Sequence, residues 1–254
     1  MDPIAFRPRK ATEIIDAAIE VYRRNPIHFL LLAAIVRVPW LIVQIIYLVP
    51  REGDPDAIIT SGLISMGTLV TTFFMQGFIV YMASELYLGR DTDALDTMRK
   101  VGPRVASVFF ASLLTSMALG AGLLLLVFPA VWVAAALFAV QPALVLEGKS
   151  VFGAFDRSQK LSEGVKMHVL SAIGLIVIIR IVIEMGAAII ALAVPMPALR
   201  YVIVTIAAML VYPLYSIAYT LIYYDIRIRK EGFDMEMMAK RMAPASTPAS
   251  AVSA

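Results

Sequence analysis

Residues 167–193 read MHVLSAIGLIVIIRIVIEMGAAIIALA, and this stretch decides the fold. It is almost entirely apolar, and Arg180 and Glu184 are the Arg and Glu that interrupt it. About 20 apolar residues in an α-helix suffice to cross the roughly 30 Å hydrocarbon core of a bilayer. The stretch therefore predicts a transmembrane helix, and its two charges mark a position that needs an explanation.

Five further segments of this kind occur along the chain. Hydrophobic residues make up 60% of it and charged residues 16%, whereas soluble domains carry about 25% charged residues. We predict an all-α, polytopic membrane protein with six transmembrane helices near residues 26–49, 57–87, 105–127, 129–147, 167–193 and 198–224. We expect one membrane domain over residues 1–241 and a disordered tail over residues 242–254, which has no apolar periodicity.

The basic residues indicate how the chain is threaded. Eighteen of the 22 Lys and Arg residues lie before the first predicted span, in the second and fourth loops, and after the last span. The opposite loops hold only Arg51, which lies beside the acidic Glu52, and Arg200. Because loops rich in Lys and Arg stay in the cytoplasm, we predict that the N- and C-termini are both cytoplasmic.

Three short stretches, at residues 12–24, 93–101 and 151–161, have apolar residues at helical spacing and charged residues elsewhere. Each one precedes a pair of predicted spans. We expect amphipathic helices that lie in the cytoplasmic interface of the membrane. The chain then consists of three units, each an interfacial helix followed by a membrane hairpin.

Polar side chains fall inside several predicted spans. A charge near the centre of a span costs about 2.5 to 3.5 kcal/mol on insertion scales, so each one requires a partner. Residues seven or four positions apart share a helix face, and hydroxyl residues follow such steps in the second and sixth spans. We therefore expect the first, second, fifth and sixth helices to share a polar interior around Arg37, Gln44, Gln76, Arg180 and Glu184.

This polar interior has two interpretations. It is either a cavity for a substrate or a lipid headgroup, with Arg37 as the contact to an anion, or a set of hydrogen bonds that only join helix to helix. Hydrogen bonds between membrane helices are common, and no pattern of discontinuous half-helices marks a transport site. The sequence therefore favours the second interpretation, and Arg37→Leu would separate the two.

The sequence contains no recognisable catalytic, nucleotide-binding or metal-binding motif. It has no Cys and two His, and it shows no P-loop, HExxH or GxSxG pattern. We predict a non-enzymatic protein with no catalytic, cofactor or metal site. The basic residues gather at membrane edges, so nucleic acid is not an expected partner. The carboxylates of Glu85, Glu147 and Asp225 are expected to be solvated at cytoplasmic helix ends.

The basic residues at the cytoplasmic side have their own interpretation. They would either pair between loops or contact anionic phospholipids at the inner surface. A sharper hypothesis is a docking surface for a cytoplasmic or membrane protein partner. The candidate contacts to lipid or partner are Arg23, Arg24, Arg157, Arg227 and Arg229.

Three segments carry a family resemblance. They contain FRP, IIDAA and YRRN within residues 6–25, EGK and AFDRS within residues 147–158, and YYDIR and RKEGFD within residues 223–234. In these segments the chain resembles the membrane domain attached to some bacterial glycerophosphoryl diester phosphodiesterases, which also occurs alone in multi-span proteins. The resemblance implies a membrane anchor or accessory role in a bacterial inner membrane. It does not extend to the catalytic barrel of that family, so phosphodiesterase activity is not expected.

Two functional hypotheses follow. The first is an integral membrane protein that acts as an anchor, scaffold or accessory subunit with a docking surface on its cytoplasmic face. The alternative is a transporter or lipid-handling protein that uses the polar intramembrane cavity.

Overall fold

The computed structural model describes residues 7–48, 56–233 and 235, and in these ranges it contains helices and no strand. The elements, in chain order, are α1 (Ala11–Arg24), α2 (Pro26–Val43), the π-helical turn η1 (Gln44–Leu48), α3 (Ala57–Tyr87), α4 (Ala94–Val101), the 3₁₀ turn η2 (Gly102–Arg104), α5 (Val105–Leu125), α6 (Val127–Ala136), α7 (Val140–Leu146), α8 (Val151–Ser162), α9 (Lys166–Leu192) and α10 (Pro197–Glu231).

The described residues include six helical segments that are long and apolar enough to cross a membrane. The all-α class and the multi-pass membrane character predicted from the sequence are therefore confirmed. The six segments are Pro26–Tyr47, Ala57–Tyr87, Ala94–Leu125, Val127–Leu146, Lys166–Leu192 and Pro197–Glu231. The predicted tail at residues 242–254 and the loop residues Arg51 and Glu52 lie outside the described part of the chain.

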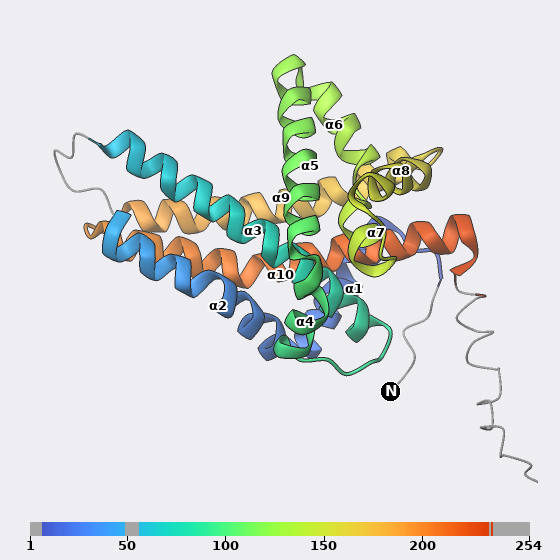
Figure 1. The fold of residues 1–254 in the computed structure, drawn as a ribbon, viewed down its shortest axis with the longest axis horizontal. Coiled ribbons are helices and arrows are strands. Elements are labelled where there is room, and N and C mark those ends of the chain that lie inside the picture. The colour runs from blue at the N-terminus through green and yellow to red at the C-terminus, as the bar shows by residue number, and fades with distance from the viewer. Residues whose placement is uncertain (1–6, 49–55, 234, 236–254) are drawn as a thin grey trace, which may run out of the picture.

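Four of the long helices, α2, α3, α9 and α10, run alongside one another, and α10 packs against each of the other three (Figure 1). The α5–α6 hairpin rises steeply from these four (Figure 1). Between the two parts lies α7, whose residues from Val140 to Val145 are all buried. A fully buried part of the core therefore lies where α7 packs against α3, α5 and α8.

The fourth predicted span is interrupted. A helix break at residues 137–139 separates α6 from α7, although we predicted one continuous helix over residues 129–147. The hydroxyl of Ser158 in α8 occupies the break: it donates to the carbonyl of Ala136 at 2.8 Å and accepts from the amide of Ala139 at 2.9 Å. The backbone groups at the break are therefore satisfied by a side chain of another helix. Hydropathy alone does not reveal such a contact.

The last helix is longer than predicted. We placed the sixth span at residues 198–224, whereas α10 continues to Glu231 and stops at Gly232, whose φ of 62° is left-handed. Glycine adopts this conformation without steric cost and commonly terminates helices. The extra two turns carry Arg227 and Arg229 beyond the apolar part of the helix.

The three short stretches form helices α1, α4 and α8, each followed by a long hairpin, as the sequence predicts. Helix α1 is amphipathic and buries Ile14, Ala18 and Val21. The side chains of Asp93 and Ser150 cap α4 and α8 by accepting backbone N–H groups at 2.7 and 3.2 Å. The position of these helices in a membrane interface stays a prediction.

Candidate functional site: a polar cavity between four long helices

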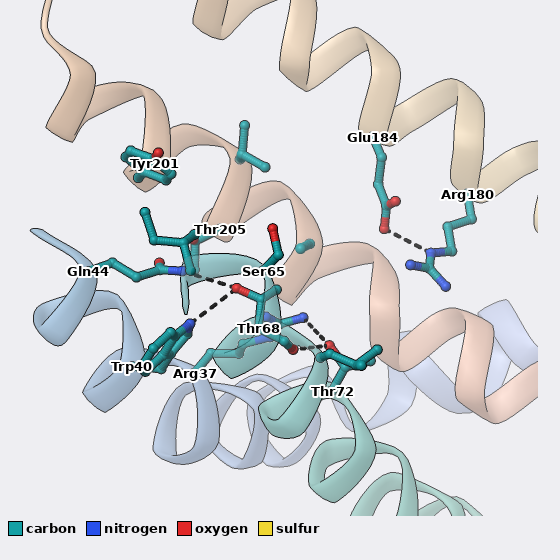
Figure 2. A pocket seen from close by; sticks show the side chains of 14 residues that line it. Arg37, Trp40, Gln44, Ser65, Thr68, Thr72, Arg180, Glu184, Tyr201 and Thr205 are labelled. Atoms are coloured by element: carbon teal, nitrogen blue, oxygen red, sulfur yellow. Dashed lines mark hydrogen bonds and ion pairs between the residues drawn. The ribbon is translucent and has the colours of Figure 1, made fainter. Parts of the chain in front are cut away.

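Polar side chains from α2, α3, α9 and α10 meet around a cavity of about 540 Å³ (Figure 2). Each helix presents them at spacings of three, four or seven residues, which keep them on one face. Of the five intramembrane residues predicted from the sequence, four line this cavity, and Gln76 does not. The lining residues are Arg37, Trp40, Gln44, Ile64, Ser65, Thr68, Leu69, Thr72, Arg180, Glu184, Tyr201, Val204, Thr205 and Ala208.

Arg37 is the most unusual of these residues, because it is a cation that is only 8% exposed. Its guanidinium donates to the hydroxyl of Thr72 at 2.8 Å (Figure 2). It also donates to the hydroxyl of Thr71 at 3.5 Å. Its Nε is buried and has no hydrogen-bond partner among the described residues. Its charge also lacks a carboxylate within ion-pair distance in the same part of the chain. The hydrogen bonds of Arg37 therefore go only to neutral oxygens, and Glu184 of the same cavity is paired with Arg180.

A hydrogen-bonded cluster around Thr68 forms the wall next to Arg37. The hydroxyl of Thr68 accepts from Trp40 Nε1 at 3.1 Å and from Gln44 Nε2 at 3.0 Å (Figure 2). The ring of Trp40 lies directly on Gly67, where a Cβ atom would stand 2.0 Å from a ring carbon. The absence of a side chain at position 67 therefore lets the indole reach Thr68. These bonds join α2 to α3, as the helix-joining interpretation requires.

The other two charges of the cavity neutralise each other. Arg180 Nε donates to Glu184 Oε1 at 2.8 Å on the same face of α9, which is the predicted ion pair. The Arg180 guanidinium also lies over the rings of Tyr212 and Tyr215, 5.5 and 5.2 Å from their centroids. Cation–π contacts of this kind stabilise a desolvated arginine. Arg180 is thus held on the α9 and α10 side, and Glu184 is already paired.

Gln76 follows Thr72 by four residues on α3 and lies outside the lining of the cavity. Its side-chain oxygen and the carbonyl of Thr72 both accept from the hydroxyl of Tyr212 at 3.4 Å. Trp40, Gly67 and Tyr201 contribute to the site or its wall, and the sequence analysis missed them. Trp40 could have been noticed because a buried indole N–H needs an acceptor.

The cavity is suited to an anion. Two arginines against one glutamate leave one uncompensated positive charge among the residues that line the cavity, and Arg37 Nε is a buried donor without a partner in the described part of the chain. Apolar side chains, including Ile64, Leu69 and Val204, line the remainder. Within the described ranges, no three His, Asp or Glu side chains gather in a way that could hold a metal ion.

A second charged region lies at the cytoplasmic end predicted from the sequence, and we call it the basic-end network. In it, Arg157 of α8 forms ion pairs with Glu147 at 2.8 Å and with Glu231. Glu231 also accepts from Arg227 at 3.0 Å, and Glu147 accepts from the hydroxyl of Tyr223 at 2.5 Å. The hydrogen bonds that Arg157 donates to Glu231 and to Glu147 raise the pKa of Arg157 above its ordinary value. The network ties α8 to the end of α10.

Asp225 forms the other half of the basic-end network, and the expectation that it is solvated was wrong. It is 3% exposed and accepts three hydrogen bonds: from the Arg9 amide at 2.6 Å, from His168 Nε2 at 2.8 Å and from Arg229 Nε at 2.7 Å. The segment before α1, the start of α9 and the end of α10 meet at this carboxylate. Its burial depends on a partner 216 residues away in sequence.

The five predicted cytoplasmic contacts are therefore in two different situations. Arg157, Arg227 and Arg229 pair with carboxylates of the protein itself. Arg23 and Arg24 are exposed on α1, and Arg24 pairs there with Glu20. The two α1 arginines have the greater access to lipid headgroups or a partner.

No model of a known protein family, no curated protein and no solved structure matches this chain. The resemblance to the phosphodiesterase-associated membrane domain thus stays a prediction, and the functional argument depends on the geometry of the site.

Proposed function

We propose that this chain is a lipid-handling protein of a bacterial inner membrane, which binds an anionic lipid headgroup in the cavity between α2, α3, α9 and α10. The observation that carries the proposal is the state of Arg37. A buried cation costs several kcal/mol unless an anion compensates it. The hydrogen bonds of Arg37 go to neutral hydroxyls, its Nε has no partner within the described residues, and the carboxylate that lines the same cavity, Glu184, is paired with Arg180. A phosphate or carboxylate from outside the chain would supply that anion.

A lipid suits this cavity better than a small soluble anion. Its volume of about 540 Å³ falls in the range of about 300 to 1,000 Å³ typical of ligand pockets. Its lining combines donors near Arg37 with the apolar side chains of Ile64, Leu69 and Val204. An anionic headgroup with hydrocarbon attached would use both kinds of surface.

The depth of the cavity gives a further expectation. Arg37 is eleven residues into α2 and Glu184 eighteen residues into α9, which correspond to about 17 and 27 Å of helix. With both termini in the cytoplasm, as the basic residues favour, the site lies in the middle and outer part of the membrane. The bound headgroup would then lie below its usual level at the membrane surface.

Native mass spectrometry of the detergent-purified protein tests the proposal. We expect the wild-type chain to retain an anionic phospholipid, and Arg37→Gln to lose it while still eluting as a single species. The matched control is Arg99→Gln, which also removes one positive charge, but from a side chain that is 81% exposed. Equal lipid retention by the wild type and Arg37→Gln would contradict the proposal. So would displacement of the lipid by inorganic phosphate, which would identify a soluble anion as the ligand.

The role of membrane anchor or accessory subunit is the second candidate. It is supported by apolar side chains that α4 and α8 leave uncovered: Leu95 is 61% exposed and Phe152 is 78% exposed. In this proposal the two helices dock a protein at the cytoplasmic face. Purification in mild detergent would then recover a stoichiometric partner, and Leu95→Ser with Phe152→Ser would release it. Repeated recovery of the chain alone would contradict this role.

A further inference from the structure

The turn between α5 and α6 differs from the other hairpin turns because no charged side chain lies near its tip. No charged residue occurs between Arg104 and Glu147. By sequence, the loop before α3 carries Arg51 and Glu52. Arg200 lies in the first turn of α10 and donates from its Nε to the carbonyl of Val194 in the α9–α10 turn at 2.6 Å. Residues 123–128 are consecutive large apolar side chains, and each is between 61% and 91% exposed. A water-exposed turn with this composition is unfavourable.

The α5–α6 turn also lies in a different place from the others. In Figure 1 it is at the top of the view, whereas the start of α3 and the turn between α9 and α10 lie at the left end of the four long helices. Helix α6 packs against both α8 and α9. The ring of Trp132 in α6 lies 4.6 Å from the Nζ of Lys166. Lys166 is the first residue of α9, at the same end of the bundle as the basic-end network.

The contact between Trp132 and Lys166 limits how far the hairpin can reach. The turn at Leu126 is six residues from Trp132, which is roughly 9 Å along a helix at 1.5 Å per residue. A hydrocarbon core is about 30 Å thick. A hairpin that crossed it fully would place Trp132 near the far side, well away from the first residue of α9.

The backbone of the turn is suited to an apolar surrounding. The amide of Leu126 donates to the carbonyl of Gly122 at 3.0 Å, so this donor is satisfied within the turn. A Cβ at Gly122 would stand 2.9 Å from the Cα of Ala130, so the two helices approach closely just below the tip. Pro129 has no N–H group to satisfy in the first turn of α6. The bond from Leu126 and the proline at position 129 therefore leave two fewer backbone donors in the turn that would require water.

We propose that the α5–α6 hairpin enters the bilayer from the side of the basic loops and that its tip, residues 123–128, ends among lipid acyl chains without reaching the opposite aqueous side. The two helices are long and apolar enough to cross, and the proposal concerns where their turn lies. The acyl chains of one leaflet are then the partner of this surface. The inference stands apart from the cavity, since no hairpin residue lines it.

Single-cysteine labelling tests this directly, because the natural chain contains no cysteine. Leu125→Cys places the probe at the tip, on a side chain that is 74% exposed and outside the core. The two controls are Lys149→Cys, in the basic loop before α8, and Ala193→Cys, in the turn between α9 and α10; both positions are exposed. Each variant is reconstituted in sealed vesicles and treated with a membrane-impermeant maleimide from one side or the other, and in parallel is spin-labelled for accessibility.

We expect the two controls to react from opposite sides and Leu125→Cys to react from neither. A spin label at position 125 should be relaxed by oxygen, which concentrates in hydrocarbon, and not by a water-soluble nickel chelate. Reaction of Leu125→Cys from the same side as Ala193→Cys would show a full crossing and overturn the proposal. A label inaccessible to both relaxants would show that protein, from a partner or a second copy, covers the tip, and would overturn it equally.

Discussion

The cavity and the basic-end network both contain buried charges, but they differ in whether each buried charge has a partner of opposite charge. In the network, Asp225 faces an amide, a histidine and an arginine, and Arg157 lies between two glutamates. In the cavity, Arg37 meets only two threonine hydroxyls, and its Nε lacks a partner within the described residues.

The difference distinguishes charges that hold the fold together from a charge left available to a ligand. Removing one member of a complete buried pair leaves the other without compensation, and this costs stability. A buried charge that has no counterion already lowers the stability of the folded state, because it has lost its hydration. Removing that charge removes this destabilising free energy. The two regions should therefore respond in opposite directions to the loss of a charge, and the following predictions are ordered by the size of the expected effect.

The largest effect is expected for Asp225→Ala. The substitution leaves the Arg9 amide, His168 and Arg229 without their common acceptor. Breaking a buried charged cluster of this kind costs about 3 kcal/mol. Thermal unfolding in detergent should show a clearly lower midpoint for Asp225→Ala and an unchanged one for Asp16→Ala, an exposed aspartate of α1. Equal midpoints for the two variants would mean that the network does not hold the helix ends.

Gly67→Ala should have the next largest effect on stability. It changes the cavity by a steric overlap and removes no charge. The new methyl group would overlap the Trp40 ring, which must move away from Thr68. Overpacking costs roughly 1 to 3 kcal/mol, and the loss of the cavity wall should abolish lipid retention. In a Trp132→Phe background, the emission of Trp40 should shift. Gly62→Ala, in the same helix with no atom near the added Cβ, is the control that should change neither property.

Arg157→Gln should cost less, on the order of 1 kcal/mol, because its ion pairs are only partly shielded from water. A double-mutant cycle with Glu231→Gln should reveal coupling between the two side chains. Since the pKa of Arg157 is raised in the folded protein, its contribution to stability is fully present below the pKa of an arginine in the unfolded chain, which lies far above neutral pH. The stability difference from wild type should therefore stay constant as pH rises from 6 to about 9. A difference that disappears over this range would contradict the assignment.

The sequence was sufficient for the helices and for most of the cavity. Long apolar segments must satisfy their backbone internally, so hydropathy placed the boundaries within a few residues for most of the spans. Polar residues at steps of three and four must share a face, which is why Arg37, Gln44, Arg180 and Glu184 were grouped correctly.

The features that the sequence did not predict all depend on contacts between distant segments. The break at residues 137–139 lies in uniformly apolar sequence and exists because Ser158 satisfies its backbone groups. Asp225 resembled a solvated helix-end charge until the Arg9 segment was found to cover it. Trp40 and Gly67 meet only when α2 packs on α3. Helical periodicity describes one helix at a time and contains no information about contacts between helices.

The measurement that tests the central claim most directly is the thermal unfolding of Arg37→Leu with and without added anionic phospholipid. We expect the variant to unfold at or above the wild-type midpoint in detergent, because an uncompensated charge is replaced by an apolar side chain. Phosphatidylglycerol should raise the midpoint of the wild type, as a ligand specific for the folded state does, and leave that of Arg37→Leu unchanged; phosphatidylcholine should affect neither. A strongly destabilised Arg37→Leu, or an equal response of both proteins to phosphatidylglycerol, would show that Arg37 serves the fold and not a ligand.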